Sequence, residues 1–191
     1  MRLAPLKVLG VIGIVGAPWV LIDFINNGLY DRFVLTSASG IRSFFFMTGW
    51  ICSILGLYRL HEPMSNARRF PFWVLLFFLL LADIWNVMEV IDPHSQSGLF
   101  YLLNFSWPLG GLFMIVTSIV VIRSKRLKGW KKYMPLLASL WFPQTMFIAW
   151  AGLDGFEALI ISGLYAAISF GLLGFSLIAA SAERMEQRAF G

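Results

Sequence analysis

Two stretches of this chain contain no charged residue over a length that can cross a lipid bilayer. Residues 98–122 and 158–182 are each 25 residues long and lack Asp, Glu, Lys and Arg. A helix needs about 20 apolar residues to cross the roughly 30 Å hydrocarbon core of a membrane. The composition agrees, because 59% of the residues are hydrophobic and only 13% are charged, whereas soluble domains are about 25% charged. The sequence therefore predicts a membrane protein.

The same kind of apolar segment recurs along the whole chain and predicts six membrane-spanning helices. Their expected bounds are 8–30, 41–58, 71–91, 98–122, 133–153 and 157–182. Because the connections are short, consecutive helices are expected to be antiparallel neighbours. We therefore predict an all-α, polytopic integral membrane protein in which residues 1–191 form a single six-helix bundle with short loops. Pro108 and Pro143 are expected to kink the fourth and fifth helices.

The positions of Lys and Arg predict the orientation, because cytoplasmic loops carry an excess of both residues. Only Arg32 and Arg42 fall on one side of the predicted topology. The other side carries Arg2, Lys7, Arg59, Arg68, Arg69, Arg123, Lys125, Arg126, Lys128, Lys131, Lys132, Arg184 and Arg188. Both termini are therefore predicted to be cytoplasmic. The first segment is interpreted as a retained helix rather than a cleaved signal peptide, and the expected location is the cell membrane, the inner membrane in a bacterium.

The loop 123–132 carries six of these cations and has two interpretations. It could bind anionic lipid head groups, with about 1 kcal/mol of attraction per cation. Alternatively, it only follows the charge rule for cytoplasmic loops, with Trp130 and Tyr133 as interfacial anchors. The expected partner is the lipid bilayer and not nucleic acid, because the basic patch lies against a membrane and matches no nucleic-acid-binding module. Assembly into a homo-oligomer is left open.

Polar residues inside the predicted helices concentrate in the half of the membrane opposite the basic loops. In the first helix Asp23, Asn26 and Asn27 share one face, and in the third helix Asp83 and Asn86 lie at a spacing of three. Polar groups in lipid are costly and often mark a binding site. The predicted ligand-binding residues are Asp23, Asn26, Asn27, Asp83, Asn86, Asn104, Gln144 and Tyr165, with Glu89, His94 and Trp107 as a weaker outer rim.

The two intramembrane acids, Asp23 and Asp83, are central to this prediction. Since no Lys or Arg is expected inside a helix beside them, they would have to be protonated, share a proton, bind a cationic ligand or face a water-filled vestibule. Together they would form the acidic floor of a pocket that opens outward. The alternative is structural, with the same side chains hydrogen-bonding between helices to hold the bundle together.

No motif in the chain indicates a cofactor, a metal site or an assignable catalytic residue. The favoured function is binding or transport of a small cationic or polar solute, or of protons, through the outward pocket. One alternative is an intramembrane enzyme that acts on a lipid-like substrate, with Asp83 or Glu89 as general acid or base. Another is a non-catalytic subunit of a membrane complex, whose polar stripe contacts a second chain. Enzymatic activity is left open and is not favoured.

Overall fold

The computed structural model describes residues 4–28, 35–95, 97–124, 126–152 and 155–189, and all regular structure in these ranges is helical. The elements are α1 (Ala4–Gly16), α2 (Trp19–Gly28), α3 (Ser37–His61), α4 (Asn66–Ile91), α5 (Gly98–Asn104), α6 (Ser106–Arg123), the 3₁₀ helix η1 (Gly129–Tyr133), α7 (Met134–Ser139), α8 (Trp141–Trp150) and α9 (Phe156–Ala189). The prediction of an all-α fold is confirmed for these residues. Arg2, Arg32, Lys125 and the expected helix ends at Tyr30 and Leu153 lie outside them.

Five helical segments of the described chain are long and apolar enough to cross a membrane. They are Leu6–Asn27, Ser37–His61, Asn66–Ile91, Gly98–Arg123 and Phe156–Met185. The predicted fifth span, residues 133–153, is instead divided between the end of η1 and the short helices α7 and α8, which have 6 and 10 residues. The structure thus supports five of the six predicted spans, and the crossing by residues 133–153 stays a prediction.

Two prolines explain where two of the helical segments break. A proline has no N–H, so it cannot bond the carbonyl of the residue four positions earlier. Helix α5 ends at Asn104, four residues before Pro108, and α7 ends at Ser139, four residues before Pro143. The helices are therefore interrupted where the two prolines remove a backbone hydrogen bond.

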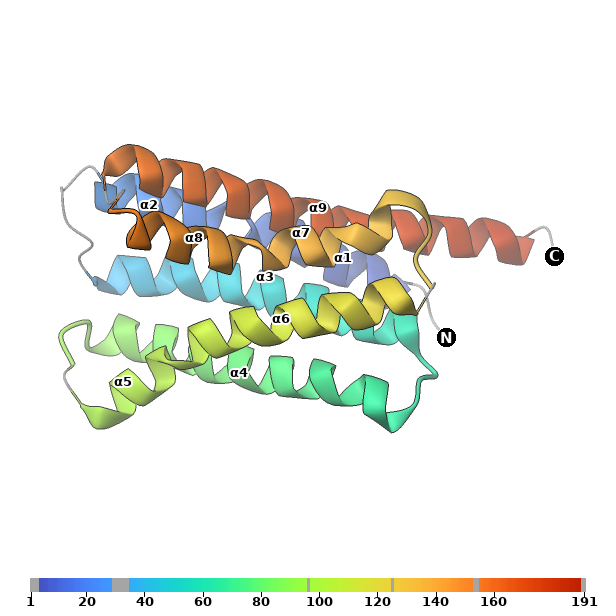
Figure 1. The fold of residues 1–191 in the computed structure, drawn as a ribbon, viewed down its shortest axis with the longest axis horizontal. Coiled ribbons are helices and arrows are strands. Elements are labelled where there is room, and N and C mark those ends of the chain that lie inside the picture. The colour runs from blue at the N-terminus through green and yellow to red at the C-terminus, as the bar shows by residue number, and fades with distance from the viewer. Residues whose placement is uncertain (1–3, 29–34, 96, 125, 153–154, 190–191) are drawn as a thin grey trace.

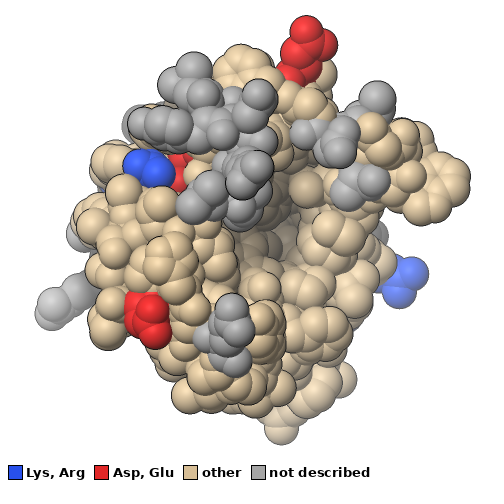
Figure 2. Space-filling model, turned by 90° about the vertical axis from the view of Figure 1, so that its left-hand side faces the viewer, with Lys and Arg blue, Asp and Glu red and all other residues tan. Residues whose placement is uncertain are grey.

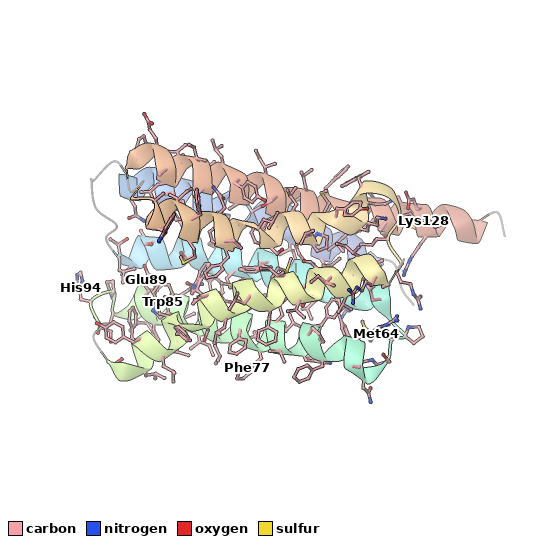
Figure 3. The ribbon with its side chains drawn as sticks, viewed as in Figure 1. Met64, Phe77, Trp85, Glu89, His94 and Lys128 are labelled. Carbon is pink, nitrogen blue, oxygen red and sulfur yellow. The ribbon has the colours of Figure 1, made fainter. Side chains whose placement is uncertain are left out.

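The helices lie side by side along the length of the bundle (Figure 1), and their contacts close into a ring. Helix α1 packs on α3, α3 on α4, α4 on α6, α6 on α7, α7 on α9, and α9 returns to α1. Consecutive segments are thus neighbours, as the short connections predict. Met64 and Lys128 lie at one end of the bundle and His94 at the other (Figure 3). We call these the basic end and the pocket end.

Glycines allow the closest approaches in the ring. A Cβ atom added to Gly16 of α1 would lie 2.8 Å from Cα of Gly49 on α3, and one added to Gly10 would lie 2.7 Å from the carbonyl oxygen of Gly174 on α9. Since real Cβ atoms do not approach that closely, only glycine fits at these contacts. Small residues at helix contacts are a common means of association in lipid. Helix α1 is thereby held against both of its neighbours.

The half of the bundle nearer the basic end has an apolar interior. Leu57, Leu60, Phe72, Leu75 and Leu177 are each 0% exposed. The outward faces of the same helices carry large exposed apolar side chains, among them Phe77, Leu80 and Ile168. A bundle that is apolar both inside and outside matches a lipid environment.

Candidate functional site

A cavity of about 330 Å³ opens at the pocket end. It is lined by residues of α2, α3, α4, α5, α6 and α8, and Figure 2 shows the hollow in this face of the molecule. Along α3 the lining extends from Ser39 through Ser43 to Trp50. At 1.5 Å per residue the cavity therefore reaches roughly 16 Å into the bundle. The cavity therefore extends well into the long apolar helices.

Aromatic rings close the inner end of the cavity. The ring centroid of Phe46 lies 5.0 Å from that of Phe170, 5.5 Å from Trp141, 6.1 Å from Trp50 and 6.2 Å from Trp107. Trp50, Trp107 and Trp141 also line the cavity. We call these five residues the aromatic cluster. Because the apolar interior follows directly below it, the cavity does not continue to the basic end.

Asp23 of α2 lies in the wall of the cavity and forms an ion pair with Arg42 of α3. The distance from Arg42 Nε to Asp23 Oδ1 is 2.8 Å, and the Asp23 side chain is only 4% exposed. Asn27 Nδ2 and Ser39 Oγ each donate to Asp23 Oδ2 at 3.1 Å. The prediction that Asp23 has no cationic partner is therefore wrong.

The position of Arg42 follows from the start of α3. The Thr36 hydroxyl accepts a hydrogen bond from the N–H of Ser39 at 3.0 Å and caps the helix, which begins at Ser37 rather than at the predicted residue 41. Ser39 and Arg42 are then three residues apart within one helix and share a face. Both side chains reach Asp23 from that face.

Glu89 of α4 supplies the second acid of the cavity. It is 1% exposed, lines the cavity, and interacts electrostatically with Asp23 and Arg42. The Ser39 side chain and the Thr36 backbone are close enough to interact with Glu89. The Ser39 hydroxyl donates to Asp23, however, and neither carboxyl oxygen of Glu89 makes a hydrogen bond of good geometry with the described residues. Figure 3 shows Glu89 near the pocket end, one helical turn from Trp85. Glu89 therefore offers an unused polar group to the cavity.

Asp83 does not belong to this cavity. It is half-buried and receives one hydrogen bond, from Asn86 Nδ2 at 3.3 Å. On α4 it lies about 120° away from Glu89, at 100° per residue, beside the exposed Ile84 and Val87. The predicted acidic floor of Asp23 and Asp83 is thus replaced by Asp23 and Glu89.

The other predicted ligand residues divide between the cavity and the surrounding structure. Asn104 and the rim residue Trp107 line the cavity, and Asn27 supports Asp23. Asn26 Nδ2 bonds its own helix at the carbonyl of Ile22, 2.7 Å away. His94 is exposed in the turn after α4 and is not part of the lining.

Three further predicted residues lie outside the lining. Tyr165 donates its hydroxyl to the carbonyl of Leu137 at 2.7 Å, which ties α9 to α7. Asn86 is 0% exposed, and its Oδ1 has no partner in the described part of the chain. The same holds for Oε1 of the half-buried Gln144. Tyr165 therefore bonds between helices, as in the structural alternative, and the ligand role of all three stays a prediction.

Several lining residues were not predicted from the sequence, among them Ser43 and Thr145, which add hydroxyl groups, and Trp50, which adds an aromatic wall. Trp85 also lines the cavity. The indole N–H groups of Trp50, Trp85 and Trp107 have no acceptor within the described residues. A sequence signal for Trp85 exists: it lies four residues before Glu89, so the two side chains share one face of α4.

The lining combines apolar walls with a small number of polar groups. Neither His nor Cys is among the lining residues, and no group of three or more His, Cys, Asp or Glu residues in the described chain is placed to hold a metal ion. Of the two lining acids, Asp23 is engaged by Arg42, and the Ser39 hydroxyl beside Glu89 donates to Asp23 rather than to Glu89. The cavity therefore has the features of a ligand pocket, with apolar walls and a few polar groups.

Fold and cavity together indicate an all-helical integral membrane protein with a pocket at one end of the bundle. Comparisons with protein-family models, curated proteins and solved structures found no match to this chain. The functional conclusion therefore depends on the geometry of the pocket.

Proposed function

We propose that this protein binds a small solute in the pocket and receives it from the non-cytoplasmic side of the membrane. The observation that carries the proposal is a cavity of about 330 Å³ that is open at one end, closed by aromatic rings at the other, and supplied with the unpartnered carboxyl of Glu89. Membrane proteins that only bundle helices have no need of such a cavity. Its volume lies at the lower end of the range for small-molecule sites, about 300–1,000 Å³.

The orientation is part of the proposal. The start of α1, the end of α9 and the α6–η1 connection lie together at the basic end (Figure 1). Lys128 and Lys132 belong to this connection and its 3₁₀ helix, whereas Arg42, at the pocket end, is neutralised by Asp23. The excess of cations at one end supports a cytoplasmic basic end. The pocket then opens outward.

The sixth crossing is also proposed rather than established. Helices α7 and α8 run from the basic end back to the pocket end alongside α6 and α9 (Figure 1). Residues 134–150 would span about 25 Å if fully helical. Together with the five long segments they would place both termini on the cytoplasmic side. An even number of crossings puts both termini on one side, and the charge distribution assigns that side to the cytoplasm.

Transport through the bundle would require a second conformation. In the present one the aromatic cluster and the apolar interior separate the cavity from the basic end. A solute could pass only if Phe46 and Trp50 moved away from Phe170, which belongs to α9. Binding is thus the function that the geometry supports directly, and transport is its possible extension through movement of α9 against α3.

The accessibility and orientation of the pocket can be tested with single cysteines. Cys52 is first replaced with Ala, and Ser43→Cys or Lys128→Cys is then introduced. In intact cells a small, membrane-impermeant thiol reagent is expected to modify the cysteine at position 43 at once. The cysteine at position 128 should react only after lysis. The reverse pattern would refute the orientation, and protection of position 43 under both conditions would refute the open pocket.

Binding itself can be tested by filling the cavity. Ser43→Phe places a ring in the lining, whereas Val116→Phe adds the same ring to an exposed apolar face. A set of small amines, alcohols and carboxylic acids is screened for an increase in the melting temperature of the purified full chain. Stabilisation by at least one compound should be lost in the Ser43 variant and retained in the Val116 variant. Equal stabilisation of both variants would place the binding site elsewhere.

A further inference from the structure

We propose that the ligand of this pocket is a small organic monoamine, bound as its ammonium ion by Glu89 and enclosed by tryptophan rings. This inference rests on the proposed function, and it adds the chemical class of the solute. The charge, the walls, the unpartnered donors and the volume of the cavity each limit that class.

The charge of the ligand follows from the described ionisable groups at the cavity. Asp23 and Arg42 neutralise one another at 2.8 Å, so Glu89 is the remaining acid. It is 1% exposed, and although it lies close to Ser39 and to the Thr36 backbone, neither of its oxygens makes a hydrogen bond of good geometry within the described part of the chain. A buried carboxylate without a partner is strongly unfavourable. A ligand with one positive charge and N–H donors would neutralise the Glu89 carboxylate and donate hydrogen bonds to its oxygens.

The walls of the cavity favour an organic cation over an inorganic one. Trp50, Trp85, Trp107 and Trp141 line it together with Phe24 and other apolar residues. Aromatic faces attract an ammonium group, and the attraction increases when water is excluded. A bare metal ion would instead need several converging oxygen ligands to replace its water shell. The Asp23 oxygens are already occupied by Arg42, Asn27 and Ser39, so they do not provide such a shell.

The indole N–H groups add a requirement at the other end of the ligand. Those of Trp50, Trp85 and Trp107 lack acceptors among the described residues. Trp85 lies one helical turn from Glu89, whereas Trp50 lies at the inner end of the cavity. An oxygen on the part of the ligand remote from the ammonium could accept from the indole N–H of Trp50. The geometry therefore points to an amine with a hydroxyl, ether or carbonyl oxygen at its far end.

The volume limits the size of the ligand. A cavity of about 330 Å³ has room for about eleven water molecules at about 30 Å³ each. That corresponds to a molecule of roughly ten non-hydrogen atoms by the same measure. Long-chain lipids and peptides exceed this volume. A phenylethylamine with one ring oxygen matches the size, the charge and the remote acceptor.

The test uses three probes of nearly the same shape on the purified full chain. Tyramine carries the ammonium group, tyrosol carries a neutral hydroxyl in its place, and 4-hydroxyphenylacetate carries a carboxylate. Binding is measured by tryptophan fluorescence and by the shift in melting temperature. We expect tyramine to bind at least tenfold more tightly than tyrosol, and the carboxylate to bind most weakly, because it would face Glu89.

Two variants assign the discrimination to Glu89. Glu89→Gln keeps the shape of the side chain and removes its charge, and it is expected to weaken tyramine binding at least tenfold while changing tyrosol binding by less than threefold. Asp92→Asn removes an exposed acid one turn further along the chain, at the same end of the bundle. It should leave the affinity for tyramine within twofold. This control separates a specific contact from a general loss of negative charge.

The outcomes distinguish this inference from the proposed function. If tyrosol and tyramine bind equally well and Ser43→Phe abolishes both, the pocket binds solutes but the amine class is wrong. Retention of tyramine affinity in Glu89→Gln would also overturn the amine assignment. If tyramine does not bind but a neutral or acidic compound raises the melting temperature, and Ser43→Phe abolishes that effect, the pocket again binds solutes but the amine class is wrong. If no probe or screened compound binds, both proposals fail.

Discussion

Removal of the Arg42 side chain should destabilise the fold by about 3 kcal/mol, because it leaves the buried Asp23 carboxylate without its cation. Two unit charges about 4 Å apart attract each other by about 4 kcal/mol at an effective dielectric constant near 20. Loss of one member of a buried pair typically costs about 3–5 kcal/mol. The lower end of that range applies here, since the Arg42 side chain is 17% exposed and Asp23 keeps its bonds from Asn27 and Ser39.

The experiment is a double-mutant cycle of Arg42→Gln, Asp23→Asn and the combination of the two. The free energy of unfolding is measured by titration with sodium dodecyl sulfate in mixed micelles, followed by circular dichroism. The double variant should lose only about 1 kcal/mol relative to the wild type, because neither charge is then left unpaired. Arg59→Gln removes an exposed cation from the same helix and should change the free energy by less than about 0.5 kcal/mol.

Two results would refute this reasoning. A loss below about 1 kcal/mol in Arg42→Gln would mean that the pair contributes as little as an exposed ion pair. Additive effects of the two substitutions would mean that Asp23 and Arg42 act independently, whatever the distance between them. Either result would also remove the ground for treating Glu89 as the remaining acid of the cavity.

Three further substitutions test the packing and capping of the bundle by the same unfolding titration. Gly49→Ala should lower the free energy of unfolding by about 1–3 kcal/mol, because its Cβ would lie 2.9 Å from Cα of Gly16. The control Gly171→Ala should not lower it, since its Cβ would meet only an ordinary contact at 3.9 Å. Equal losses in the two variants would contradict the close approach of Gly49 and Gly16. Thr36→Ala should lower the free energy of unfolding by about 1 kcal/mol, because it removes the cap of α3. Thr36→Ser keeps the hydroxyl and should retain most of the wild-type stability; a Ser variant as unstable as the Ala variant would show that the hydroxyl is not the stabilising group. Trp141→Phe should cost about 1 kcal/mol, because its indole N–H no longer donates to Ser162 Oγ; an unchanged free energy would count against that bond.

The apolar segments and the proline breaks were predictable from the sequence because each depends on local chemistry. An uncharged apolar run of sufficient length can cross a bilayer regardless of which helices pack against it. Pro108 likewise removes a backbone hydrogen bond regardless of the helix's neighbours. The division of residues 133–153 was less evident. Pro143 signalled the break, but the resulting helices α7 and α8 are each too short to count as a span.

The face of a membrane helix is harder to predict, and Asp83 and Glu89 show why. In water the buried face of a helix is apolar and the exposed face is polar, so the pattern identifies the core. In lipid both faces are apolar, and the sequence around the two acids does not show which of them turns inward. Glu89 was assigned to the rim because it lies near a helix end. The packing of α4 against α3 instead turns it into the cavity.

The ion pair of Asp23 required information that no single segment contains. Its two members come from different helices, and the intervening connection says nothing about their distance. A start of α3 at residue 41 would have left Arg42 at the helix terminus, in reach of water. Recognition of Thr36 as a helix cap would have moved the start forward and would have suggested Arg42 as an intramembrane cation.

The closed ring has a consequence for the order in which the protein is assembled during synthesis. Helix α1 contacts α9, which leaves the ribosome after the other described helices. The tight contact between Gly10 and Gly174 can form only after α9 has been made. Contacts between segments so distant in sequence form slowly. Until α9 is made, the face of α1 that will contact it is exposed to lipid or to a chaperone. A chain truncated before α9 would therefore have its helices in contact but the ring not closed.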